Sequence, residues 1–120
     1  MEAFDILGDP VRRRILELLS TQERSAGSVV EIVQAEFGLT QPAVSRHLRV
    51  LRENGFAEVR SEGTRRLYAL NGDALKDVED WLGDLRRQWD RRVDALETEL
   101  ARGRRRQRAS GQPSRRQSNV

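Results

Sequence analysis

Residues 40–55 read TQPAVSRHLRVLRENG, and this stretch has the features of one short helix with a marked beginning and end. Thr40 can accept a backbone N–H bond at the start, and Pro42 suits the first turn because its missing donor costs nothing there. Gly55 supplies the left-handed conformation that ends a helix at little cost. The apolar residues share one stripe at about 100° per residue; they are Val44, Leu48 and Leu51. The stretch therefore predicts a helix over about 40–54 with one buried side.

The opposite side of this helix carries amide, hydroxyl and guanidinium groups. These are Gln41, Ser45, Arg46, Arg49 and Arg52. In the DNA major groove Gln can pair with adenine, and Arg can bind guanine or phosphate. Any surface helix of a globular domain also has an apolar seam and a polar back. The helix alone leaves both interpretations open.

The residues before this helix predict three further helices. The first covers 2–7, and the second begins at the start signal Asp9-Pro10. A polar loop over 20–27 follows, after which Ser28 can cap a third helix that ends at Gly38. The connection to residue 40 is then only two to three residues long, which is typical of a helix-turn-helix.

Arginines 12–14 form a charge run at the start of the second helix. We interpret the run as a solvated face, with a phosphate contact as the alternative. His47 lies at the edge of the predicted seam, where packing or a hydrogen bond is a commoner role for an imidazole than sensing pH.

After Gly55 the hydrophobic period changes toward two. Residues 56–61 and 65–70 are strand candidates, joined by Glu62-Gly63-Thr64. A hairpin here, about 56–70, would be the wing of a winged helix-turn-helix. Arg65 and Arg66 fall near its tip. They can reach phosphate or a minor groove, and they can equally protect a strand edge from pairing with another sheet.

A last helix is predicted over 72–102, with Asn71 as its cap. Its apolar residues follow one another at intervals of three and four, close to a coiled-coil repeat; they are Leu75, Val78, Leu82, Leu85, Trp89, Val93, Leu96 and Leu100. A domain this small cannot cover so long a seam. The seam predicts a partner helix, most simply that of a second copy, and the alternative is that its far end frays in solvent.

The tail at 103–120 holds six arginines and no acid, which predicts disorder. Without those six, 16 basic face 19 acidic residues, so residues 1–102 carry −3 while the whole chain carries +3. The high isoelectric point therefore belongs to the tail. Two roles stay open for it: salt-sensitive attraction to nucleic acid, and solubility.

The composition excludes several classes of protein. There are no cysteines and one histidine, so neither disulfides nor a thiolate or histidine-rich metal site is expected. No apolar run spans a membrane, and the start lacks a secretory signal, from which we expect a cytoplasmic, nucleoid-associated protein. No paired nucleophile and base or Gly-rich phosphate loop is evident, so we expect neither an enzyme nor a cofactor.

Three stretches resemble the ArsR family of bacterial winged helix-turn-helix repressors. They are FDILGDPVRRRILELL at 4–19, LTQPAVSRHLRVLRENGFAEVRSEGTRRLYAL at 39–70 and LKDVEDWLGDLRRQWDRRVDALETEL at 75–100. The last is similar to the metal-independent branch of the family. The resemblance implies a mainly α fold with a small β-hairpin, with a DNA-binding domain at 1–71 and a long C-terminal dimerisation helix at 72–102.

The resemblance also implies a homodimer that blocks a promoter by binding double-stranded DNA at an inverted repeat. The positions matching base-contacting residues are Gln41, Ser45 and Arg46, and those expected at phosphate or in the wing are Thr40, Arg49, Arg65 and Arg66. The first and last helices would form the dimer interface, through Phe4, Leu7, Leu75, Val78, Leu82, Leu85, Trp89 and Val93. A protein-interaction module and a non-specific architectural DNA binder are the alternatives.

The chain departs from the metal-sensing members of that family. Where those carry a Cys pair, residues 31–38 read EIVQAEFG, and the last helix has no His. We therefore expect no metal site, and the sequence does not identify an effector.

Overall fold

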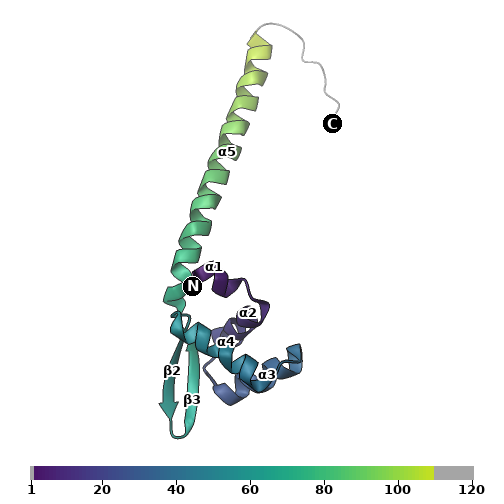
Figure 1. Ribbon diagram of the computed structural model, residues 1–120. Coiled ribbons are helices and arrows are strands. Elements are labelled where there is room, and N and C mark those ends of the chain that lie inside the picture. Colours follow the sequence, from purple (N-terminus) through teal and green to yellow (C-terminus); the bar gives the residue numbers. More distant parts are fainter. Residues whose placement is uncertain (1, 110–120) are drawn as a thin grey trace. The chain divides into compact units, whose positions relative to one another are not determined.

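The computed structural model describes residues 2–109 and has the winged helix-turn-helix fold that the sequence predicts. In chain order the elements are α1 (Ala3–Leu7), α2 (Pro10–Thr21), β1 (Arg24–Ser25), α3 (Ala26–Phe37), α4 (Gln41–Glu53), β2 (Ala57–Glu62), β3 (Arg65–Leu70), a 3₁₀ turn (Gly72–Leu75) and α5 (Lys76–Ala109). The chain divides into two compact units, which meet after Asp80. In the first unit, helices α1–α4 lie together and the β2–β3 hairpin stands beside them (Figure 1).

One hydrophobic core holds the helices and the hairpin of the first unit together. The apolar stripe of α4 is completely buried, because Val44 and Leu51 are 0% exposed and Leu48 is 2% exposed. The other buried side chains come from α1–α3 and the sheet region; they include Ile6, Ile15, Leu19, Val29, Val33, Phe56 and Tyr68. Burial of this apolar area is the main favourable term for so small a domain.

The helix ends follow the predicted local signals in most places. Asp9 Oδ1 accepts hydrogen bonds from the backbone N–H groups of Val11 (2.8 Å) and Arg12 (3.2 Å). Thr40 Oγ1 accepts one from Ala43 at 3.3 Å. Gly38 ends α3 with φ 68°, a conformation that glycine adopts without strain. The turn into α4 is therefore fixed on both sides.

The wing is an antiparallel hairpin whose register pairs Val59 with Tyr68 and Glu62 with Arg65. Its turn has Gly63 at φ 63°, which suits the first position of a two-residue hairpin loop. The predicted strands are confirmed with a shift of one residue at the first. Tyr68 is buried, while Val59 and Leu70 pack at the edge of the core.

The loop prediction for residues 20–27 is wrong in part. Arg24 and Ser25 form β1, which pairs with β3 and makes a three-stranded sheet in the order β1-β3-β2. The cap of α3 is Ser25, whose hydroxyl accepts the N–H of Ser28, so Ser28 is not the cap. A strand of two residues carries no readable period, and the pairing that defines it comes from residues more than forty positions later.

The interpretation of arginines 12–14 as a solvated face holds in part: Arg13 is exposed, but all three side chains also form contacts within the fold. Arg12 donates to the carbonyl oxygens of Ile6 (3.1 Å) and Asp5 (2.9 Å), and Arg13 donates to that of Leu7 (2.6 Å). These carbonyls lie at the end of α1, where no helical partner remains for them. Arg14 instead forms a bidentate pair with Glu36 of α3, at 2.8 and 3.0 Å.

Helix α5 is longer than the predicted 72–102. It begins at Lys76 after the 3₁₀ turn, which Asn71 caps, and it continues to Ala109. The disorder predicted from residue 103 is therefore wrong for residues 103–109, and residues 110–120 lie outside the described part. None of the helices in residues 2–109 is long and apolar enough to cross a membrane.

The cap at Asp9 gives a test of the fold. Asp9→Ala removes both accepted hydrogen bonds and should lower the free energy of unfolding by about 1 kcal/mol, within a range of 0.5–2 kcal/mol, measured by urea denaturation. Asp9→Asn retains an acceptor and should cost less. An unchanged stability for Asp9→Ala at neutral pH would contradict the role of the cap.

The same carboxylate makes stability depend on pH. Burial opposes ionisation of Asp9, but the N–H groups of Arg12 and Val11 outweigh it, so the pKa lies below its ordinary value of 3.8. Because the folded-state pKa is lowered, this contribution is present above pH 3.8 and is lost as pH falls through the folded value. The Asp9→Asn variant should lack this component in urea titrations at acidic pH.

Candidate nucleic-acid interface

Burial of the α4 stripe decides which of its side chains face solvent. With Val44, Leu48 and Leu51 directed into the core, Gln41, Arg46 and Arg49 are exposed, and Ser45 and Arg52 are half-buried. Thr40, just before the helix, is exposed as well. The polar side of α4 is thus uncovered within its own unit.

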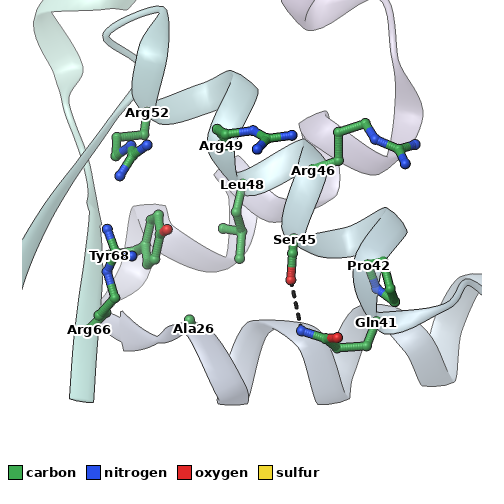
Figure 2. A pocket seen from close by; sticks show the side chains of 10 residues that line it. All are labelled: Ala26, Gln41, Pro42, Ser45, Arg46, Leu48, Arg49, Arg52, Arg66 and Tyr68. Carbon is green, nitrogen blue, oxygen red and sulfur yellow. Dashed lines mark hydrogen bonds between the residues drawn. The ribbon is translucent and has the colours of Figure 1, made fainter. Parts of the chain in front are cut away.

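An open groove lies along this polar side, between α4, the start of α3 and strand β3 (Figure 2). Its lining residues are Ala26, Gln41, Pro42, Ser45, Arg46, Leu48, Arg49, Arg52, Arg66 and Tyr68. The groove therefore joins the helix to the wing, which are separate elements in the sequence. Leu48 and Tyr68 form its apolar floor together with Ala26.

Two polar side chains of α4 are ordered against each other at one end of the groove. The Gln41 amide nitrogen donates to Ser45 Oγ at 3.0 Å, across one helical turn (Figure 2). The amide oxygen of Gln41 is left as an acceptor, and the Ser45 hydroxyl keeps its own proton as a donor. This pair limits the conformations of two groups that can form hydrogen bonds with a ligand.

The groove is strongly cationic. Arg46, Arg49, Arg52 and Arg66 line it, and none of its described lining residues is acidic. Within residues 2–109 these four guanidinium groups form no ion pair, whereas Arg14 and Arg60 each form a bidentate pair with a glutamate. Four uncompensated cations beside one groove attract a polyanion.

The two wing arginines have different surroundings. Arg66 lines the groove, on the same side of β3 as Tyr68. Arg65 is adjacent in the chain, so its side chain points to the other face of the strand. It pairs with Glu62 at 3.0 Å and lines a separate hollow with Arg24 and Ser28.

Arg52 is the one groove arginine that was not among the expected DNA contacts. It lies three residues after Arg49 on the same helix, so helical spacing could have included it. The signal was weak because position 52 also suits a cation at the end of a helix, where it stabilises the helix dipole.

His47 connects α4 to α2 and does not face the groove. Its Nδ1 lies 3.4 Å from Nη1 of Arg12. Burial lowers the pKa of His47 below 6.5, and the charges of Arg12 and Arg46 add to this, while Asp9 opposes it. The neutral imidazole is therefore favoured near pH 7, and its Nδ1 can accept a hydrogen bond from Arg12. Packing, rather than sensing, fits this environment.

Among residues 2–109 no group of three or more His, Cys, Asp or Glu side chains is arranged to hold a metal ion. The chemistry that the groove offers is hydrogen bonding and charge.

The two units carry the expected interface residues separately. On α1, Phe4 is 48% exposed and Leu7 is half-buried, whereas the α5 side chains from Leu82 to Val93 are exposed on the second unit.

The fold and the groove define a winged helix-turn-helix regulator, and comparisons with known proteins agree. A family model described as a helix-turn-helix domain matches residues 7–60. The transcriptional repressor SdpR of Bacillus subtilis is 32% identical over 79 residues, which cover 66% of this chain and 83% of that protein. An ArsR-like transcriptional regulator from Rhodococcus sp. RHA1 has a TM-score of 0.60 at 27% identity, covering 79% of this chain and 86% of that one.

A homodimeric winged helix-turn-helix DNA-binding domain from Mycobacterium bovis has the same fold, with a TM-score of 0.54 at 24% identity over 72% of this chain and 76% of that one. The chain belongs to the ArsR family, whose members are transcriptional regulators rather than enzymes.

His47 is the one histidine of the chain, so its titration can be followed without assignment ambiguity. We expect NMR to give a pKa below 6.5, and a still lower value in Asp9→Asn, which removes the negative charge that raises it. Because the folded-state pKa is lowered, stability should fall as pH drops below 6.5 toward the folded value. A measured pKa at or above 6.5 would show that His47 is not in this environment.

Proposed function

We propose that this chain is a homodimeric transcriptional repressor that binds an inverted-repeat operator and thereby blocks a promoter. The observation that carries the proposal is the groove of four uncompensated arginines beside the exposed polar side of α4. The named relative SdpR is a transcriptional repressor, which supports the same function here.

Base reading is assigned to the first half of α4. A Gln amide can bond adenine through both of its polar atoms, and Arg can bond guanine in a bidentate manner. Gln41 and Arg46 are exposed, and Ser45 holds the Gln41 amide in place before DNA arrives. For a bidentate contact with adenine, the Gln41 nitrogen would exchange the Ser45 oxygen for a base nitrogen.

Phosphate contacts are assigned to the surrounding groups. Arg49 and Arg66 line the groove, and we add Arg52 because it lines the same groove. The Thr40 hydroxyl accepts an N–H bond in its cap, which leaves its proton free to bond a phosphate oxygen. Arg65 at the wing would exchange Glu62 for phosphate. Contacts of this kind fix register without reading sequence.

We include a homodimer in the proposal because the two-fold axis of a homodimer matches the symmetry of an inverted-repeat operator. In such dimers the two recognition helices bind half-sites that are about 34 Å apart, one turn of DNA, or a multiple of that distance. The α5 seam, which is exposed in the single chain, supplies an apolar surface for the second copy. The homodimeric relative from Mycobacterium bovis supports this state.

Arg46→Ala tests base reading. Binding to DNA from upstream of the protein's own gene, located by footprinting, should weaken by about 1–3 kcal/mol, and sequence preference should relax at one position per half-site. Arg49→Ala should instead weaken binding to all sequences and reduce the salt dependence.

Arg91→Ala, an exposed arginine of α5, is the matched control and should leave affinity and preference unchanged. If Arg46→Ala behaves like this control, Arg46 does not contact a base. If the wild-type protein shows no sequence preference in the footprint, the repressor proposal fails.

Leu85→Asp tests the homodimer. A charge placed in the seam that the homodimer would bury should weaken self-association by about 100-fold, the equivalent of about 3 kcal/mol, as measured by sedimentation equilibrium. Thr98→Asp introduces the same charge away from the seam and should have little effect. A Leu85→Asp protein that remains as dimeric as wild type would place the interface elsewhere.

A further inference from the structure

The last turns of α5 carry a dense group of positive charge. We name it the distal arginine cluster; it consists of Arg102, Arg104, Arg105, Arg106 and Arg108, all of which are exposed. The sequence holds no Asp or Glu after residue 99. The cluster belongs to the second compact unit, whereas the groove of α4 and the wing belongs to the first. It is therefore a surface separate from the groove.

The cluster has no counter-charge on its own helix. Nearer the start of α5, Arg86 pairs with Asp90, and Arg87 pairs with Asp84. The arginines of the cluster form no ion pair within residues 2–109. Their guanidinium groups are thus available to a ligand from outside the chain.

Stabilisation of the helix end explains only part of the cluster. Cations favour the negative end of the helix dipole, but this effect is confined to the last turn. That turn holds Arg106 and Arg108. Arg102 lies further back, three and four residues from Arg105 and Arg106, and like charges at this spacing oppose helix formation. A bound polyanion would remove this repulsion.

Part of the cluster stays exposed when the apolar stripe of α5 is covered. At about 100° per residue, Arg102 and Arg105 lie about 120–180° around the helix from Leu96 and Leu100. A second copy that packs on the stripe, as in the proposed homodimer, leaves both guanidinium groups in solvent. Self-association and binding through the cluster are therefore compatible.

The spacing of charge in the cluster matches that of duplex DNA. Residues 102–108 span about 9 Å at about 1.5 Å per residue, so their five positive charges lie about 2 Å apart along the axis. Duplex DNA carries one negative charge for about every 1.7 Å of its axis. Guanidinium groups also bind phosphate oxygens in a bidentate manner. A phosphate backbone therefore complements the cluster in both the sign and the density of charge.

The composition around the cluster disfavours a membrane as its ligand. Helices that lie on a lipid surface combine cations with large apolar side chains, which enter the acyl layer. Between residues 101 and 109 the apolar side chains are the methyl groups of Ala101 and Ala109. This part of α5 offers charge without an apolar face to insert.

We propose that the distal arginine cluster is a second DNA-binding surface, which binds the phosphate backbone of a duplex without reading its sequence. The choice of DNA as the polyanion rests on the proposed function. The cluster adds affinity that is sensitive to salt, and it leaves sequence preference to the groove. It thereby gives the basic end of α5 a role in binding nucleic acid and not in solubility alone.

Two full-length variants test the proposal through salt dependence. In one, all five arginines of the cluster are changed to Gln, which removes the charges; in the other, all five are changed to Lys, which retains them. Gln, Lys and Arg have similar helix propensities, so α5 should stay helical in both, as checked by circular dichroism. Binding to operator and non-specific duplexes of equal length is measured between about 50 and 200 mM salt.

The Gln variant should lose about 2–4 from the slope of log K against log[salt], because each lost phosphate contact removes about 0.9. A loss of about 2 corresponds to binding that is about 100-fold weaker at about 0.1 M salt. The ratio of operator to non-specific affinity should stay within about twofold of wild type, since both complexes lose the same contacts. The Lys variant should retain the wild-type slope within about one unit.

An unchanged slope in the Gln variant would overturn the inference and leave the repressor proposal standing. Wild-type protein that binds duplexes with no sequence preference would end the repressor proposal, while the slope would still report on the cluster. Wild-type protein that binds no duplex would end both. A Gln variant whose self-association is weaker in sedimentation would assign the cluster to assembly instead.

Other polyanions identify the ligand class. Poly-glutamate and vesicles that contain phosphatidylserine are tested at the same concentration of negative charge as the non-specific duplex. The change of the five arginines to Gln should weaken binding to the duplex most, because its denser charge releases more counterions. A larger loss for poly-glutamate or for the vesicles would show that the cluster binds an acidic polypeptide or a lipid surface, contrary to the proposal.

Discussion

Burial of the α4 stripe is the constraint on which the rest of the structure depends. Three apolar side chains, Val44, Leu48 and Leu51, are almost completely removed from water. Because a helix is rigid, fixing one face also fixes the opposite one. The polar side of α4 must then point outward, whatever ligand it meets. The rest of the first unit, including the caps at Thr40 and Gly38 and the arginines that hold the end of α1, keeps that helix in place.

The arginines of the chain fall into two groups that the structure separates by their partners. Arg14 and Arg60 are neutralised by Glu36 and Glu23, and their hydrogen bonds lower the pKa of both carboxyl groups. The arginines of the groove form no ion pair among the described residues, and none of the described side chains that line the groove with them is acidic. A solvent-exposed arginine without a partner beside a concave, polar surface does not lower the stability of the fold, and its guanidinium group is available to bind an anion. This distribution, more than the total charge, points to a polyanionic ligand.

Local signals in the sequence predicted α2, α4 and the wing because each has its own start, period and end. Gly38 and Asp9, for example, act within their own helix. The prediction failed where the structure depends on distant residues. Strand β1 exists because β3 lies beside it. The hydrogen bond from Arg12 to a carbonyl oxygen at the end of α1 could not be predicted from a run of three arginines. The sequence predicted the groove only as one face of a helix. Which of the two wing arginines lies beside that face depends on the register and packing of the hairpin, and the structure places Arg66 there. The end of α5 was predicted too early because Gly103 and the arginines after it resemble a tail, although arginine is a good helix former.

Binding of DNA to the arginine groove of α4 and the wing can be followed through the arginine Nε–Hε NMR signals while a duplex from the region upstream of the protein's own gene is added. We expect the signals of Arg46, Arg49, Arg52 and Arg66 to shift with a salt-dependent affinity, while that of Arg14, bound to Glu36, stays in place. Shifts confined to Arg14, Arg60 or the arginines of α5, with the groove signals unchanged, would contradict it.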